Sequence, residues 1–221
     1  MRMSKRDFLA LSGAAAGATL LSGCKPPEVT VTQNQQEEAL ESIVDGVSPI
    51  SVEERQSRVA KAQRLMEANA VDAILLEPGS AMLYFTGISW WRSERLTAVV
   101  IPRQGDIALV TPFFEEPSVR ESMSFGDDVR TWNEHDNPFE RVVGILKDRG
   151  INGGRIGLDE TVRYFVVDGL QKAAPSVEIT SATPVTQGCR MYKSAAEIAL
   201  MKKANEVTLA AYEHVYQIGR A

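Results

Sequence analysis

Residues 72–87 have the sequence DAILLEPGSAMLYFTG, which predicts a strand followed by a short helix. The run 72–76 is short and mostly apolar, as is typical of a buried strand. Pro78-Gly79 ends it, because these two residues favour turns. A short helix is expected to follow through Tyr84, capped by Ser80 and ended by Gly87. This strand and helix are the first unit of an alternating pattern.

Upstream, the segment Ser51-Val52-Glu53-Glu54 has the spacing of a capping box, in which a serine and a glutamate satisfy free backbone donors. Apolar residues then recur at helical spacing as far as Asn69, namely Val59, Ala62, Leu65 and Met66. The sequence therefore predicts a helix directly before the 72–76 strand.

Downstream, two β-rich runs at 96–101 and 107–111 flank a short loop with Gly105, which predicts a hairpin. The remaining patterns predict helices at 115–123, 139–149 and 162–173, and strands at 129–132, 155–158 and 177–181. Strands that alternate with helices indicate an α/β fold with a mixed β-sheet covered by helices.

The pattern changes after Pro184. Ser194-Ala195-Ala196-Glu197 has a second capping-box spacing, and a long helix is expected from there to about Tyr216. A helix of this length normally packs on another element, and little sequence follows it. We therefore expect this helix to begin a further domain that the 221 residues do not complete.

The first 24 residues resemble a bacterial export signal. A basic start precedes an apolar stretch at 8–21 that is too short for a typical membrane span. The segment 4–9 resembles a twin-arginine signal with lysine replacing the first arginine, so the twin-arginine and Sec routes both stay open. Residues 21–24 resemble a lipobox, which implies acylation of Cys24. We expect a periplasmic or cell-surface lipoprotein, anchored to a membrane through this lipid and a flexible spacer at 25–50.

Composition excludes some classes of protein. The chain has 29 acidic and 24 basic residues and a net charge of −5, so nothing suggests nucleic-acid binding. Two histidines and two cysteines argue against a closed zinc site. His135 lies in a polar segment and His214 in the last helix, and we interpret neither as a metal ligand.

Two motifs resemble the creatinase and Xaa-Pro peptidase family, the M24 metallopeptidases with a pita-bread catalytic domain. The first is the 72–76 run followed by Tyr84-Phe85-Thr86-Gly87. The second begins at Arg190 and has the pattern R-x-x-K-S-x-x-E-I, with Lys193, Ser194 and Glu197 at its fixed positions. The resemblance extends from about residue 52 to the C-terminus.

The resemblance implies a domain plan. Residues 51–185 are a creatinase-type N-terminal α/β domain, which supports dimer formation and lines the active-site entrance without performing the chemistry. Residues 186–221 are the junction and first helix of an incomplete catalytic domain. In the family that domain holds two divalent metal ions through two Asp, one His and two Glu, and their shared hydroxide attacks the bond preceding proline. These positions lie beyond the junction helix, so no catalytic or metal-binding residue is assigned here.

The segment that contains Trp90, Trp91, Arg92 and Arg95 has two interpretations. The first is packing of the tryptophans with a surface ion pair. The second is a substrate rim, in which the aromatic rings stack on proline and an arginine binds a peptide carboxylate.

The sequence thus favours the N-terminal portion of an exported, lipid-anchored Xaa-Pro aminopeptidase or dipeptidase-like metallohydrolase, inactive by itself and acting on proline-containing peptides when complete. Two alternatives stay open. One is a tethered module for binding or oligomerisation without catalysis. The other is a creatinase-like hydrolase or a lyase on the same scaffold.

Overall fold

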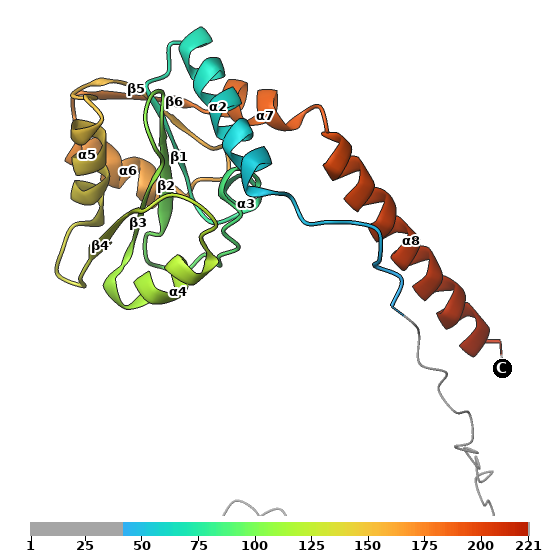
Figure 1. Ribbon diagram of the computed structural model, residues 1–221. Helices are drawn as coiled ribbons and strands as arrows, with labels where there is room; N and C mark the ends of the chain where they lie inside the picture. The colour runs from blue at the N-terminus through green and yellow to red at the C-terminus, as the bar shows by residue number, and fades with distance from the viewer. Residues whose placement is uncertain (1–41, 221) are drawn as a thin grey trace, which may run out of the picture. The chain divides into compact units, whose positions relative to one another are not determined.

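Six short strands form one mixed sheet in the order β4-β3-β2-β1-β5-β6 (Figure 1). The computed structural model describes residues 42–220, so the predicted leader, Cys24 and most of the predicted spacer lie outside the described residues. The strands are β1 (Ala73–Leu76), β2 (Ala98–Pro102), β3 (Ala108–Pro112), β4 (Asp128–Trp132), β5 (Gly154–Leu158) and β6 (Val177–Ser181).

The helices are α2 (Val52–Ala68), α3 (Ser80–Thr86), α4 (Glu116–Ser122), α5 (Pro138–Asp148), α6 (Tyr164–Ala173), α7 (Thr183–Arg190) and α8 (Ala195–Ile218), with a 3₁₀ turn, η1, at Phe113–Glu115. None of the helices within residues 42–220 has the length and apolar character needed to cross a membrane. The mixed α/β fold predicted from the sequence is confirmed, as is the long C-terminal helix.

Only β2 runs against its neighbours. It pairs antiparallel with β1 and with β3, while β1 and β5, β5 and β6, and β3 and β4 pair in parallel. The predicted hairpin is therefore the β2–β3 pair. Five strands point in one direction, so the segments that follow them reach the same edge of the sheet as the segment that precedes β2.

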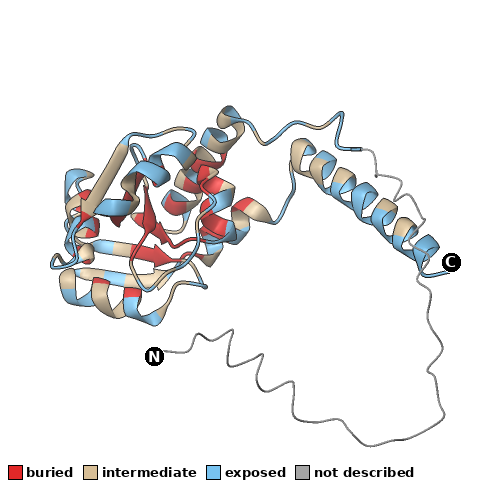
Figure 2. Cartoon of the chain, turned by 90° about the horizontal axis from the view of Figure 1, so that it is seen from below, coloured by how far each residue is buried: buried red, intermediate tan, exposed pale blue. Residues whose placement is uncertain are grey.

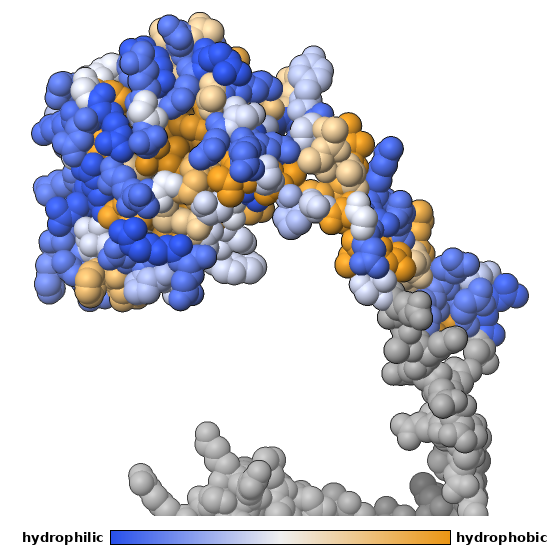
Figure 3. Space-filling view, viewed as in Figure 1, coloured by the Kyte–Doolittle hydropathy of each residue, from blue (hydrophilic) through white to orange (hydrophobic). Residues whose placement is uncertain are grey.

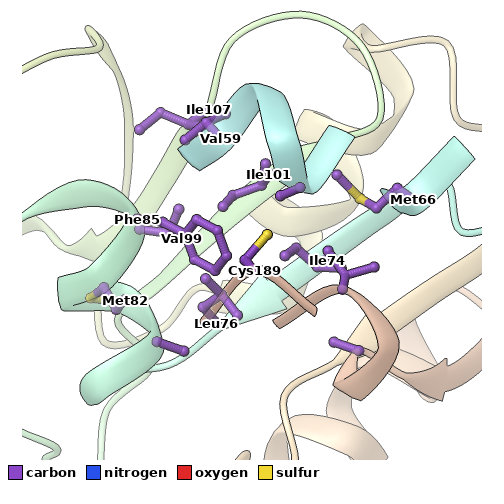
Figure 4. Close-up of a cluster of buried hydrophobic side chains, with 14 of the residues drawn as sticks. Val59, Met66, Ile74, Leu76, Met82, Phe85, Val99, Ile101, Ile107 and Cys189 are labelled. Carbon is purple, nitrogen blue, oxygen red and sulfur yellow. The ribbon is translucent and has the colours of Figure 1, made fainter. Parts of the chain in front are cut away.

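Each face of the sheet has its own apolar core. Ile74 and Leu76 of β1 belong to the core under α2, α3, α4 and α7, and Figure 4 shows the side chains gathered there. Ala73 and Leu75 belong to the core under α5 and α6. Strand residues alternate between faces, so the four residues of β1 supply both cores and all are fully buried. In Figure 2 the buried residues accordingly concentrate in the sheet and the inner faces of its helices.

Local details differ from the sequence prediction. Ser80 is the first residue of α3 rather than its cap; Gly79 occupies the cap position without a side-chain hydrogen bond. Helix α7 was not predicted. It is short and contains Gly188 and β-branched residues, which weakens its helical signal. The boundary predicted between residues 185 and 186 falls inside α7, which buries Val185 and Cys189 against the same core as α2.

Helix α8 begins with the predicted capping box, in which Ser194 and Glu197 exchange backbone and side-chain hydrogen bonds. None of its described residues is buried. Large apolar side chains are exposed along it, and the space-filling view shows them as orange patches (Figure 3). The most exposed of them are Leu209, Tyr212 and Val215.

Two helical glycines should respond oppositely to alanine. A Cβ at Gly169 in α6 would lie 2.0 Å from Cε2 of Phe139, whose ring also packs edge-on against Phe165. We expect Gly169→Ala to lower the free energy of unfolding by about 1–3 kcal/mol through overpacking. At Gly144 in α5 the nearest atom is at an ordinary 3.5 Å, so Gly144→Ala should stabilise by up to about 1 kcal/mol. Urea denaturation of both variants tests this, and equal effects would contradict the close packing of α5 on α6.

Candidate functional site

The segment that leads into β2 carries the residues predicted to form a substrate rim. Because β2 is antiparallel, this segment lies at the edge where β1, β3, β4 and β5 end. In open α/β sheets this carboxyl edge is the usual position of binding sites, since the loops there leave the sheet together. We call the segments at this edge the carboxyl-edge surface, comprising residues 77–78, 90–97, 113–115, 133–134 and 159–165.

The two tryptophans have different environments. Trp90 is half-buried against the core, and its indole Nε1 donates to Oε2 of Glu115 at 3.3 Å. The same oxygen accepts from Oγ1 of Thr97 at 3.1 Å and of Thr111 at 3.4 Å, so Glu115 joins the rim segment to β3. Trp91 is 91% exposed. Trp90 therefore packs against the core, whereas the Trp91 ring is accessible to a ligand.

Arg92 and Arg95 are held by the protein in different ways. Arg92 is exposed; its Nε donates to the Pro78 carbonyl at 2.8 Å and its Nη2 to Oγ1 of Thr161 at 2.7 Å. These bonds leave donors of the guanidinium for a ligand. Arg95 pairs with Glu134 at 3.0 Å and with the adjacent Glu94. The hydrogen bond to Glu134 raises the pKa of Arg95. The charge of Arg95 is therefore already paired within the protein.

A buried ion pair beneath the segment was not predicted. The Glu77 side chain is fully buried, and its Oε1 accepts from Nε and Nη2 of Arg163 at 3.0 and 2.6 Å. Its Oε2 accepts from the Arg163 backbone N–H at 2.8 Å. The guanidinium also donates to the carbonyl of Ser93 in the rim segment. The position of Glu77, directly after a wholly buried strand, was the only sequence signal for this pair.

The carboxyl-edge surface also exposes aromatic rings that the sequence analysis did not single out. Phe113 and Phe114 are 61% and 59% exposed, and Tyr164 is 78% exposed. The guanidinium of Arg95 lies over the Phe114 ring, 5.3 Å from its centroid. With Trp91 these rings make a surface suited to stacking on apolar or planar groups.

The junction motif joins α8 to α2. Ser194 Oγ accepts from the Glu197 backbone N–H at 3.1 Å and donates to Oε1 of Glu54 at 2.8 Å. Glu54 therefore does not complete a capping box with Ser51, which accepts only the Glu54 N–H at 3.2 Å. Burial works to raise the pKa of Glu54, but hydrogen bonds from Ser194 and Arg58 outweigh it and lower the pKa.

Arg58 is the buried centre of this junction. Its Nη2 lies 2.6 Å from Oε1 of Glu54 and 3.6 Å from Oε1 of Glu197, and its Nη1 donates to the Tyr84 carbonyl at 2.9 Å. The guanidinium stacks over the Tyr84 ring at 4.1 Å. Burial raises the pKa of the Tyr84 phenol, which donates to the Cys189 carbonyl at 3.1 Å. Arg58 thus links Tyr84 of the first family motif to Glu197 of the second.

Lys193 and Arg190, the other two motif residues, make fewer contacts in the junction. Lys193 donates to the carbonyls of Arg190 and Met191 at the end of α7, and Arg190 lies 6.0 Å from the Tyr84 ring centroid. His135 is exposed and His214 is half-exposed on α8. Within residues 42–220 no group of three or more His, Cys, Asp or Glu side chains fits a metal ion.

A mixed sheet with one antiparallel strand, covered by helices on both faces and joined by an ion-paired junction to a long helix, defines an α/β domain. Residues 58–192 match the family model for the creatinase/prolidase N-terminal domain, and the chain belongs to this family.

The relatives include peptidases. The chain is 32% identical to an uncharacterized peptidase of Schizosaccharomyces pombe, over 75% of this chain and 38% of that protein. It is 30% identical to a protein of Mycobacterium tuberculosis named "Probable dipeptidase PepE", over 65% of this chain and 39% of the relative. The crystal structure of dipeptidase PepE from Mycobacterium ulcerans superposes with a TM-score of 0.63 at 28% identity, over 69% of this chain and 40% of that one. The chain thus spans about two fifths of the length of these relatives.

Removing the cation of the buried ion pair should destabilise the fold. Arg163→Met leaves the Glu77 carboxylate buried without its partner, and we expect the free energy of unfolding to fall by about 3 kcal/mol. In the double variant Glu77→Gln/Arg163→Met no charge is stranded, so part of this loss should be recovered. Chemical denaturation of the two single variants and the double variant measures the coupling, and strictly additive losses would show that the pair does not interact.

The Glu54 contacts predict a pH dependence of stability. A carboxyl with a lowered folded-state pKa stabilises the protein above its unfolded-state pKa of about 4.3, and this stabilisation is lost as the pH falls through the folded-state value. Glu54→Gln should therefore be less stable than the wild type at pH 7, with the difference shrinking below about pH 4. Thermal unfolding across this range tests it, with Glu67→Gln on the same helix as the control. A difference independent of pH would contradict the assignment.

Proposed function

We propose that this chain is the N-terminal portion of an exported, lipid-anchored metallohydrolase of the Xaa-Pro aminopeptidase or dipeptidase type. The observation that carries the proposal is the alignment with dipeptidases that extend well beyond it: the M. tuberculosis relative is 30% identical over 39% of its own length. In this proposal residues 51–185 do not perform the chemistry. Their role is to support a homodimer and to line the entrance of an active site formed elsewhere.

The carboxyl-edge surface suits the entrance role. Trp91 offers a wholly accessible ring that can stack on a proline ring, and Arg92 retains donors for a peptide carboxylate. Trp90 and Arg95 are held by Glu115 and Glu134, so they position the segment and do not bind the peptide. The buried pair of Glu77 and Arg163 fixes the segment from below through Ser93.

The leader, Cys24 and the proposed catalytic domain lie outside residues 42–220. Two divalent metal ions are expected in the catalytic domain of the complete enzyme, held by residues beyond those of this chain. Acylation of Cys24 is expected to anchor the protein to a membrane on the exported side.

The chain of 221 residues should be inactive alone. Purified chain, supplied with Mn²⁺ or Co²⁺ and with Xaa-Pro dipeptides and longer Xaa-Pro peptides, should give no turnover. The same substrates should be cleaved when the chain is followed by a domain with the Asp, Asp, His, Glu, Glu metal-binding set. Turnover by the chain together with binding of two metal ions would overturn the proposal that residues 51–185 do not perform the chemistry.

In such a longer enzyme, Trp91→Ala and Arg92→Ala should each raise KM for an Xaa-Pro peptide about tenfold, with kcat little changed, because they remove binding contacts and not reacting groups. Arg103→Ala is the matched control, since Arg103 follows β2 at the opposite edge of the sheet and pairs with Asp72. Unchanged KM in both rim variants would remove the substrate-rim assignment while leaving the peptidase proposal intact.

A second enzyme function has a specific observation in its favour. The chain is also 22% identical to a creatinase of Bacillus, over 80% of this chain and 43% of that protein. It is 22% identical to an ectoine hydrolase of Halomonas elongata, over 77% of this chain and 45% of that protein. Assaying the longer protein with creatine and with Xaa-Pro peptides separates these activities. A chain that binds partners and has no catalytic domain at all would instead support the tethered module.

A further inference from the structure

The junction contains a pocket whose charge differs from that of the whole chain. It has a volume of about 230 Å³ and lies between α2, Tyr84, the end of α7 and the first turn of α8. Four cationic side chains line it, namely Arg58, Lys61, Arg64 and Lys193, against the two carboxylates of Glu54 and Glu197. The pocket is therefore net positive by two charges, although the chain carries −5.

The two carboxylates are already satisfied. Glu54 accepts from Arg58 and Ser194, and Glu197 accepts from the Ser194 backbone N–H at 2.9 Å and lies near Arg58. The charge of Arg58 is thus compensated within the junction. What remains uncompensated is the charge of the other three cations.

None of these three cations makes an ion pair with any residue in 42–220. Among the described residues, Lys61 and Lys193 donate only to backbone carbonyls at the end of α7, and no hydrogen bond there holds Arg64. Elsewhere eight arginines each face a carboxylate: Arg95, Arg103, Arg120, Arg130, Arg141, Arg149, Arg155 and Arg163. Several other cations of residues 42–220, among them Arg55, Arg92 and Arg190, also lack an ion pair. What distinguishes Lys61, Arg64 and Lys193 is that they line one pocket together.

The position of these groups suits a compact anion. Lys61 and Arg64 follow Ser57 along one face of α2, and Lys193 approaches from the segment between α7 and α8. The hydroxyls of Ser57 and Tyr192 also line the pocket and can donate hydrogen bonds. The positive end of the α8 dipole adds to the attraction, because Ser194 and Glu197 of its first turn belong to the lining.

We propose that the junction pocket binds a phosphate group. A charge of +2 matches that of a phosphate near neutral pH, about −1.5 to −2, better than that of a carboxylate. Cations that approach from two elements also suit a tetrahedral oxyanion. The phosphate has two sources, free inorganic phosphate or the headgroup of an anionic lipid. Binding there would join α2 to the start of α8 through Arg64 and Lys193, independently of any peptidase activity.

The test uses the full chain and two probes. Binding of inorganic phosphate is measured by titration calorimetry, and binding to phosphatidylglycerol vesicles by co-sedimentation, with phosphatidylcholine vesicles alongside. The pocket variant is Arg64→Gln/Lys193→Gln, both exposed residues. The matched control is Lys147→Gln/Lys202→Gln, which removes the same charge from exposed residues outside the pocket. Residues 1–24 are the same in every protein compared.

A free-phosphate site predicts that the pocket variant binds phosphate at least roughly tenfold more weakly, while the control retains wild-type affinity. A lipid-headgroup site predicts that the pocket variant loses binding to phosphatidylglycerol vesicles, again with the control unchanged. If neither probe distinguishes the pocket variant from the control, the proposal is wrong. The melting temperature of each variant is compared with the wild type, and Arg64→Gln alone, at a position without side-chain hydrogen bonds, replaces the double variant if the latter is destabilised.

Discussion

The fold depends on the burial of β1 on both faces of the sheet. Its four residues supply alternate side chains to two separate cores, as those of its neighbour β2 do, and these two strands are the middle pair of the sheet. Burying each large aliphatic side chain contributes about 1.5–3 kcal/mol, so these few residues connect the two helical layers energetically. Because β1 pairs antiparallel with β2 and parallel with β5, it also determines which connecting segments share an edge.

That arrangement explains why the carboxyl-edge surface has its particular chemistry. The chain leaves β1 at Glu77, whose buried carboxylate requires a cation, and Arg163 supplies it from the segment after β5. Arg163 also donates through Nη1 to the carbonyl of Ser93, in the segment before β2. One ion pair therefore links segments that are far apart in sequence, and it leaves Trp91 to project outward.

Much of this fold was predictable because its elements have strong local signals. The apolar run at β1, the hairpin loop with Gly105 and the capping box at Ser194 all correspond to elements of the structure. Helix α7 was missed because its burial comes from packing on α2 rather than from its own sequence. A Cβ at Gly188 would lie 3.1 Å from Cδ1 of Leu65, so the two helices approach closely there. The tertiary partner supplies what the local propensity does not.

The site was less predictable for a related reason. Trp90, Trp91, Arg92 and Arg95 stand out in the sequence, but adjacent positions in an extended segment point in opposite directions, and the sequence did not assign which tryptophan faces solvent. Glu77 and Arg163 are separated by 86 residues, and Glu54 and Ser194 by 140. Neither contact follows from spacing along the chain. Only the topology of the sheet and the packing of α7 on α2 bring these residues together.

The two surfaces differ in how they use arginine, and this difference bears on what each can recognise. At the carboxyl edge the charges of Arg95 and Arg163 are neutralised by glutamates, so aromatic rings dominate what is exposed. The exposed rings suit stacking, while Arg92, which has no carboxylate partner within residues 42–220, adds a charged contact that salt would screen. At the junction the glutamates neutralise Arg58 alone and leave Arg64 and Lys193 available. Recognition there is electrostatic and should weaken as ionic strength rises, since screening acts most on exposed charges. The domain in this way offers two chemically distinct surfaces, one at each of the places where its topology brings distant segments together.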